Sequence, residues 1–202
     1  PMAQMSFITP MHPVEAIKSG ADEAVCGDCP AKPSNLNYCY VGVGRSIRSA
    51  WLSASKSNVV DIETLKVNRN VRNVRLGTYG DPAAAPRSLL DRLIAKFKRH
   101  TGYTHQWVTR PDLSDILMAS VDSVDEAIYA KSKGWRYFRT KREEEPLLAG
   151  EIMCPAPRGV VVCDKCLLCD GKKSAQDKRK NIVIDVHGTT AGRYIPNTHS
   201  LV

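Results

Sequence analysis

The sequence predicts an α/β fold: a partial or open (β/α) barrel with mostly parallel strands and a cysteine-rich, metal-binding C-terminal segment. From about residue 71, short apolar strands alternate with helical stretches, which is typical of crossover connections in a parallel sheet. About six strands are expected, too few for a closed barrel of eight. An open or partial barrel therefore fits the 202 residues best, and a doubly wound sheet comes second.

The first clear strand covers residues 71–76 and ends in the turn G-T-Y-G-D-P at residues 77–82. The helix after it has apolar residues on one face, and Gly102 follows the basic residues that mark its end. Further strands are expected at residues 104–109, 116–121, 135–140, 152–153 and 182–186. Ser123 and Glu126 form a capping-box pattern that opens a helix over 124–133, which Gly134 closes.

The N-terminal part is less regular. Residues 26–39 are expected to form a loop, and residues 40–57 a helix weakened by Gly42 and Gly44. We expect one compact unit, in which residues 1–150 hold the cysteine loop and the (β/α) core. Residues 151–202 then form a cysteine-cluster segment packed on that core.

The amino-acid composition limits the classes of protein to which the chain can belong. At 43% hydrophobic and 25% charged residues, the chain is an ordinary globular sequence with no apolar run long enough to cross a bilayer and no visible signal peptide. We expect no membrane partner and a cytoplasmic location, where an odd number of cysteines stays reduced. The net charge of +8 and the pI near 9.2 favour polyanion partners, that is, nucleic acid or a nucleotide.

The C-terminal cysteines form the tighter of two clusters. Cys163, Cys166 and Cys169 read C-x2-C-x2-C, and Cys154 precedes them in a Cys-Pro pair. This spacing wraps the backbone around one point, which suits a 4Fe-4S cluster and also suits zinc. Cys154 is the favoured fourth ligand, and His187 is the competing one.

The N-terminal cysteines form an incomplete set. Cys26, Cys29 and Cys39 read C-x2-C-x9-C, which leaves a metal site one protein ligand short, as catalytic sites do. Three thiols on an iron–sulfur cluster would leave one iron free for a substrate or cofactor. A zinc site would require a further partner such as His12, and a single composite site of all seven thiols is also open.

Polar residues follow several of the predicted strands. Because ligands gather at the C-terminal ends of strands in such folds, four of them are candidate catalytic residues: Asp81, Asp122, Arg110 and His105. The G-T-Y-G-D-P turn adds three candidates for close approach to a cofactor: Gly77, Tyr79 and Gly80. The alternative for Asp81 is helix capping, and the alternative for His105 is a hydrogen-bonded core position.

The combination of motifs resembles a family of uncharacterised cysteine-rich proteins encoded by bacteriophages, over roughly residues 26–187. The matching positions are Cys29-Pro30, Cys39-Tyr40, Gly80-Asp81, Thr109-Arg110, Cys154-Pro155 and Cys163/Cys166/Cys169. The chain departs from that family in lacking a further cysteine between Pro30 and Cys39 and in having Cys26 upstream. The resemblance implies the cytoplasm of an infected bacterial host and no particular activity.

More remotely, the layout is similar to radical S-adenosylmethionine enzymes. They carry three cysteines, the last preceded by an aromatic residue, on a loop at the mouth of a partial (β/α) barrel. Tyr38-Cys39 matches that last feature, whereas the C-x3-C-x2-C spacing typical of those enzymes is absent. The resemblance implies S-adenosylmethionine as a cofactor, beside one or two 4Fe-4S clusters.

Three hypotheses follow. The first is a phage iron–sulfur metalloprotein, an enzyme that modifies a nucleotide or nucleic-acid base by radical or redox chemistry. The second is a zinc-dependent, base-exchanging transglycosylase-like enzyme that uses Asp81 and Asp122. The third is a non-catalytic, zinc-stabilised module that binds nucleic acid or a host protein. The substrate and the oligomeric state are left open.

Overall fold

A computed structural model describes residues 1–35, 38–56 and 62–196 of the chain. The strands form two sheets, a three-stranded one in the order β1-β2-β3 and a five-stranded one in the order β4-β5-β6-β8-β7. Every pairing is parallel. The strands are β1 (Met2–Ser6), β2 (Asn73–Tyr79), β3 (Arg99–Thr101), β4 (Tyr103–Thr104), β5 (Met118–Val121), β6 (Tyr137–Lys141), β7 (Glu151–Met153) and β8 (Asn181–Asp185).

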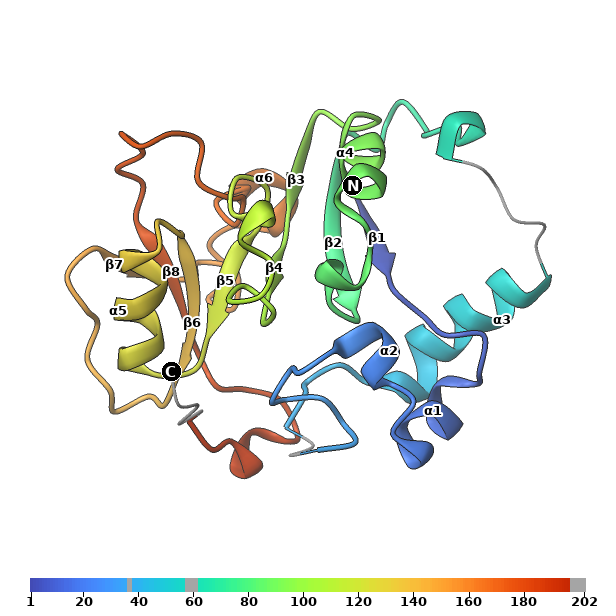
Figure 1. Cartoon of the computed structure of the whole chain (residues 1–202), viewed down its shortest axis with the longest axis horizontal. Coiled ribbons are helices and arrows are strands. Elements are labelled where there is room, and N and C mark those ends of the chain that lie inside the picture. Colours follow the sequence, from blue (N-terminus) through green and yellow to red (C-terminus); the bar gives the residue numbers. More distant parts are fainter. Residues whose placement is uncertain (36–37, 57–61, 197–202) are drawn as a thin grey trace.

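Helices connect the strands and also gather at one end of them. They are α1 (Pro13–Ser19), α2 (Glu23–Cys26), α3 (Arg48–Lys56), α4 (Arg87–Ile94), α5 (Val124–Ser132) and α6 (Cys163–Cys166). Figure 1 shows α1, α2 and α3 together at the lower right of the view, beyond the C-terminal end of β1. The N-terminal segment therefore covers the edge where ligands collect in parallel sheets.

The chain passes from one sheet to the other at Gly102. The amide of Gly102 donates to the carbonyl of Cys169 at 2.7 Å, and its carbonyl accepts from the amide of Met118 at 3.1 Å. A Cβ atom here would lie 2.7 Å from a methyl group of Leu117. Glycine thus lets β3 and β4 form one nearly continuous segment that pairs with β2 on one side and β5 on the other.

The main core lies between the strands and the helices α4 and α5. Leu90 and Leu93 of α4 are buried against Val74 and Leu76 of β2. Ala127 and Ala130 of α5 belong to the same cluster. Each fully buried leucine contributes about 1.5–3 kcal/mol relative to an exposed one, so this face anchors the sheet.

Several sequence expectations are confirmed. The α/β class with parallel strands is observed, and so are strands within 71–76, 116–121, 135–140 and 182–186 and the helix predicted over 124–133. The hydroxyl of Ser123 accepts from the amide of Glu126 at 3.2 Å, and the Glu126 carboxylate accepts from the amide of Asp122 at 2.7 Å. The closure of these strands into a partial barrel stays a prediction.

The strand predicted at 104–109 is wrong beyond Thr104. The Thr104 hydroxyl accepts from the amide of Gln106 at 2.9 Å, and the Gln106 carbonyl accepts from the amide of Arg110 at 2.9 Å. These local hydrogen bonds form turns in place of pairing with a neighbouring strand. Trp107 therefore lies in a loop, although its side chain is buried. His105 follows β4 and does not lie within a strand.

Two further expectations need correction. The helix before Gly102 ends at Ile94, and Arg99–Thr101 pairs with β2 as a strand. The helix expected over 40–57 begins as a π-turn at Val43–Ile47 and continues as α3, while residue 57 lies outside the described residues. The C-terminal segment, by contrast, supplies β7 and β8 to the five-stranded sheet, where strands were expected at 152–153 and 182–186. Within the described ranges, no helix has the length and apolarity to span a membrane.

Candidate functional site

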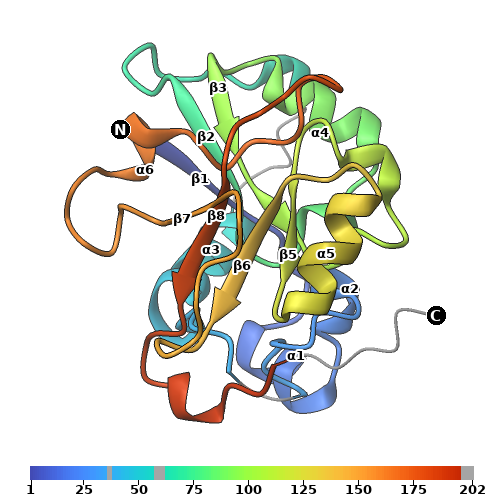
Figure 2. The same ribbon diagram turned by 90° about the vertical axis from the view of Figure 1, so that its left-hand side faces the viewer.

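One cavity of about 310 Å³ collects the candidate residues. All seven cysteines line it, together with residues that follow the strand ends, including Asp81, His105 and Asp122. The cysteines reach it from two sides. Cys26, Cys29 and Cys39 come from the N-terminal segment at the C-terminal ends of the strands, and the other four from the segment around α6 (Figures 1 and 2). Two motifs far apart in the sequence therefore share one cavity.

The G-T-Y-G-D-P turn holds the N-terminal cysteine loop in place. The amide of Asp81 donates to the carbonyl of Val25, the residue before Cys26, at 2.6 Å. Gly80 has φ +74°, and a Cβ there would lie 2.8 Å from Phe7 and 3.1 Å from the Val25 carbonyl. Glycine is required at this position because the cysteine-bearing helix approaches the backbone so closely.

Asp81 is buried and fully used by the protein itself. One carboxylate oxygen accepts from the amide of Ala83 at 2.9 Å, which is the capping role. The other accepts from the amide of His105 at 2.8 Å. Asp81 is therefore a positioning residue that fixes the backbone of His105 beside the cavity.

A chain of polar contacts runs from the N-terminal thiols into the five-stranded sheet. Nδ1 of His105 lies 3.3 Å from the Cys29 sulfur, and Nε2 lies 3.5 Å from the Asp122 carboxylate. The Tyr38 hydroxyl donates to the same carboxylate at 3.2 Å. Burial disfavours the imidazolium, but Cys29 and Asp122 outweigh it and raise the pKa of His105 well above its usual range. His105 thus carries a proton between a thiol and a buried carboxylate.

The C-terminal cysteines surround one helical turn. Cys163 and Cys166 begin and end α6, so their spacing of three places them on one side of the turn. Leu167 then takes a left-handed backbone conformation with φ +55°, which redirects the chain toward Cys169. Cys154 follows β7 directly, and its amide donates to the carbonyl of Val183 at 2.6 Å.

Arg136, buried before β6, fixes the backbone on both sides of Cys169. Its guanidinium donates to the carbonyl of Leu168 at 2.9 Å, to that of Asp170 at 2.6 Å and to that of Lys180 at 2.7 Å. One side chain therefore joins the cysteine segment to the strand that follows it. No signal in the sequence distinguished Arg136 from the other basic residues.

The thiols form two electrostatic groups. Burial, then Cys29, Asp22 and Cys39, raise the pKa of Cys26 to about 12. Burial also raises the pKa of Cys39 to about 11. At the other side, burial followed by the three thiols of the same group raises the pKa of Cys169 to about 12. This grouping favours two sites over one composite site.

Cys154 and His187 differ in their surroundings. After burial, the neighbouring Cys154 thiol contributes most to the raised pKa of Cys169. Nδ1 of His187 instead donates to the carbonyl of Asp185 at 3.0 Å, and the His187 ring packs on Tyr40 at 5.1 Å between centroids. The geometry therefore favours Cys154 as the fourth member of the C-terminal group.

Among the described residues, no three His, Cys, Asp or Glu side chains are arranged so that they could hold a metal ion as they stand. The chemistry of the donors nevertheless suits a cation. All seven cysteines are free thiols, and Asp22, Asp81 and Asp122 are buried near the N-terminal three. One carboxylate oxygen of Asp22 has no hydrogen-bond partner among these residues. A bound metal would offset this concentration of buried acids and would displace the thiol protons.

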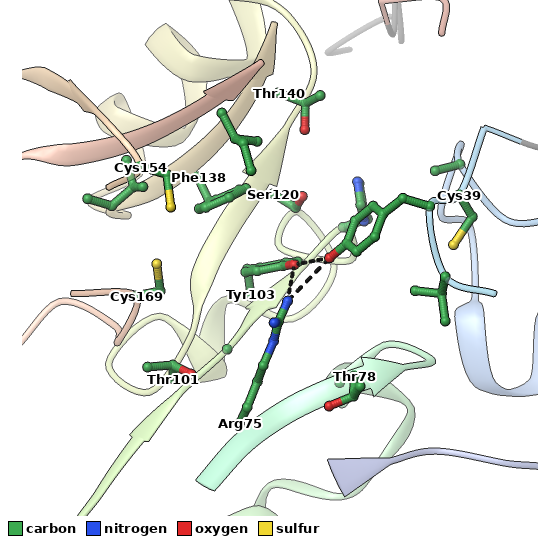
Figure 3. Close-up of a pocket in the computed structure, with 18 of the residues that line it drawn as sticks. Cys39, Arg75, Thr78, Thr101, Tyr103, Ser120, Phe138, Thr140, Cys154 and Cys169 are labelled. Carbon is green, nitrogen blue, oxygen red and sulfur yellow. Dashed lines mark hydrogen bonds between the residues drawn. The ribbon is translucent and has the colours of Figure 1, made fainter. Parts of the chain in front are cut away.

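The centre of the cavity holds a cation that the sequence analysis missed. Nη2 of Arg75 donates to the Tyr103 hydroxyl at 3.0 Å and to the Tyr40 hydroxyl at 3.3 Å, and these two hydroxyls lie 2.6 Å apart (Figure 3). The alternation of side chains along β2 could have located it. Val74 and Leu76 point to the core, so Arg75 points to the opposite face.

The remaining predicted residues take different places. Gly77, Tyr79 and Gly80 line the cavity, and their contact with a ligand stays a prediction. Arg110 is not one of the lining residues, because its guanidinium pairs with Asp112 and donates to the carbonyls of Ala83 and Ala85. Its position supports a structural role and gives no support to substrate contact.

Comparison with protein-family models, with curated proteins and with solved structures found no match.

Proposed function

We propose that the protein is an iron–sulfur enzyme with two clusters that face one substrate cavity. The observation that carries the proposal is the placement of two groups of thiols, three and four in number, around a single cavity of about 310 Å³. Cavities of this size accept small molecules, and a redox centre at the wall can exchange electrons with what they hold.

The two groups suit different roles. Cys154, Cys163, Cys166 and Cys169 would complete the coordination of one cluster, which makes that site closed. Cys26, Cys29 and Cys39 would leave one iron of a second cluster without a protein ligand, at the C-terminal ends of the strands. Bound clusters supply electrons for redox or radical chemistry, and an S-adenosylmethionine cofactor at the open iron extends the same proposal.

The chain's own residues prepare the cavity. Asp81 positions His105, and His105 joins Cys29 to Asp122. His105 lines the cavity beside the N-terminal group, where a substrate at that group would meet it. The positive net charge and the predicted phage context support a nucleotide or nucleic-acid base as the substrate class.

The test is the colour and metal content of protein purified without oxygen. The proposal expects a broad absorption band at roughly 400 nm and about four or eight irons with matching sulfide per chain. One or two zinc ions in a colourless protein would contradict it.

Zinc is the second candidate, because four thiols also complete a tetrahedral zinc site. A zinc-stabilised binding module would lose its fold on chelation. The transglycosylase-like alternative finds less support, since both carboxylate oxygens of Asp81 already accept backbone amides.

A further inference from the structure

Arg75 stands at the centre of the cavity without an acidic partner. Among the described residues no carboxylate lies within ion-pair distance of its guanidinium, and Nη2 donates to two phenols. The Tyr103 phenol is half-buried, and its desolvation raises its pKa well above the usual range and keeps it neutral. Arg75 therefore brings a positive charge without a carboxylate partner into a partly buried site, which is costly unless an anion joins it.

The arrangement is a built site. Arg75 lies on the strand face opposite the buried Val74 and Leu76, so its backbone is fixed by the core. Tyr103 is fixed in turn, because its ring stacks on Phe138 at 4.8 Å between centroids and 13° between planes. Figure 3 shows Arg75 and the two phenols directed toward one another, with Cys154 and Cys169 on one side and Cys39 on the other.

The wall beside this cation is apolar. Phe138, Ile182 and Ile184 line the cavity next to Tyr103. Tyr40 is half exposed, and its ring packs on His187. Tyr40 is therefore the more solvent-exposed of the two phenols. A ligand with one anionic end and one planar apolar end matches this combination of a guanidinium and an aromatic-aliphatic wall.

We infer that Arg75, with Tyr40 and Tyr103, binds the phosphate of a mononucleotide whose base lies against the Phe138 wall. The inference rests on the proposed function for its claim that this ligand is the substrate. The guanidinium offers a planar pair of donors that matches a phosphate, and the two phenols add neutral donors beside it. The anion then lies between the two groups of thiols.

The test measures binding by calorimetry on protein purified without oxygen with whatever metal it carries. The probes are the four deoxynucleoside monophosphates, the matching deoxynucleosides and inorganic phosphate. A 5′-phosphorylated DNA single strand, compared with the free mononucleotides, shows which source of the phosphate is bound. At least one phosphorylated probe should bind roughly tenfold or more tightly than its nucleoside, and inorganic phosphate should compete with it.

Three variants make the test specific. Arg75→Gln should bring the phosphorylated probe down to the affinity of its nucleoside, and Arg75→Lys should retain part of the difference. Arg72→Gln is the matched control: it removes the same charge from an exposed residue that lines a separate surface cleft. It should bind all probes as the unmodified protein does.

The results separate this inference from the proposed function. Equal affinity for nucleotide and nucleoside, or an Arg75→Gln protein that binds as tightly as the unmodified one, would overturn the phosphate site while leaving the iron content untouched. Loss of bound metal in Arg75→Gln would also overturn it, because Arg75 would then be the counter-charge of Cys154 and Cys163. Phosphate binding that depends on Arg75 in a protein without iron would support the site and contradict the iron–sulfur enzyme.

Discussion

Single residues at the G-T-Y-G-D-P turn set the position of the N-terminal thiols. Gly80 allows α2 to approach the strand end, and Asp81 ties both the Val25 carbonyl and the His105 amide to the same turn. Cys26, Cys29 and Cys39 therefore depend on Gly80 and Asp81, which lie more than forty residues further along the chain. Substitutions in this turn should affect metal binding without removing a thiol.

Gly80→Ala tests the close approach. The new Cβ would require φ near +74° and would lie 2.8 Å from Phe7, so we expect a loss of about 1–3 kcal/mol in unfolding free energy and less metal at the N-terminal group. Denaturant unfolding and metal analysis measure the two effects. Gly44→Ala is the control, because a Cβ there meets nothing within 4 Å and should leave both quantities unchanged or slightly higher.

Asp81→Ala tests the positioning role. It leaves the buried amides of Ala83 and His105 without their acceptor, and we expect a loss of about 1–3 kcal/mol in unfolding free energy. The exposed Asp28 in the cysteine loop provides a control, since Asp28→Ala should change stability by about 0.5 kcal/mol or less. Equal effects of the two substitutions would show that the turn does not depend on the Asp81 carboxylate.

At the scale of elements, the outer strands depend on an ion pair that crosses the sheet. Arg139 of β6 and Glu151 of β7 are joined by two hydrogen bonds of 2.8 Å, and both side chains are fully buried. The strand β8 lies between β6 and β7. The ion pair therefore spans β8 and joins the outermost strand, β7, to β6. Cys154 follows β7 directly and takes its position from the same arrangement.

Glu151→Gln should therefore destabilise the fold by about 3 kcal/mol, because it leaves the buried Arg139 with only the partly exposed Glu145, at 3.2 Å, as a counter-charge. Burial alone would raise the pKa of Glu151, but Arg139 outweighs it and holds the pKa below the usual value of 4.5. A lowered pKa in the folded state gives stability that is present above the unfolded value and is lost as the pH falls through the folded value. Unfolding measured from pH 7 to pH 3 should show a steeper loss for the unmodified protein than for Glu151→Gln; parallel curves would contradict this assignment.

The elements also show what the sequence could and could not predict. Helix α5 was predictable because Ser123 and Glu126 form local contacts that the sequence itself encodes. The strand β3 was not, because basic residues such as Arg99 and His100 indicate a helix end until the pairing with β2 is known. The cysteine groups were visible from spacing, whereas the place of Arg75 in the cavity depends on which face of β2 packs on α4.

At the scale of the whole molecule, distant segments complete the cavity. The Thr190 hydroxyl donates to the carbonyl of Tyr38 at 3.0 Å, and the Tyr194 hydroxyl lies 2.8 Å from the carbonyl of Asp122. The C-terminal segment therefore fastens the region of Cys39 to the end of β5. The N-terminal segment, whose strand β1 belongs to the three-stranded sheet, is thereby held beside the five-stranded sheet that contains β7 and β8.

The central claim is that the two thiol groups hold two separate iron–sulfur clusters. The most direct measurement is the iron content and the electron paramagnetic resonance spectrum of the reduced protein, beside two triple variants: Cys26→Ala/Cys29→Ala/Cys39→Ala and Cys163→Ala/Cys166→Ala/Cys169→Ala. We predict that each variant retains about half of the iron and one cluster signal of its own. Loss of all iron in either variant would contradict two clusters. An iron content that stays at the unmodified level in both variants would contradict them as well.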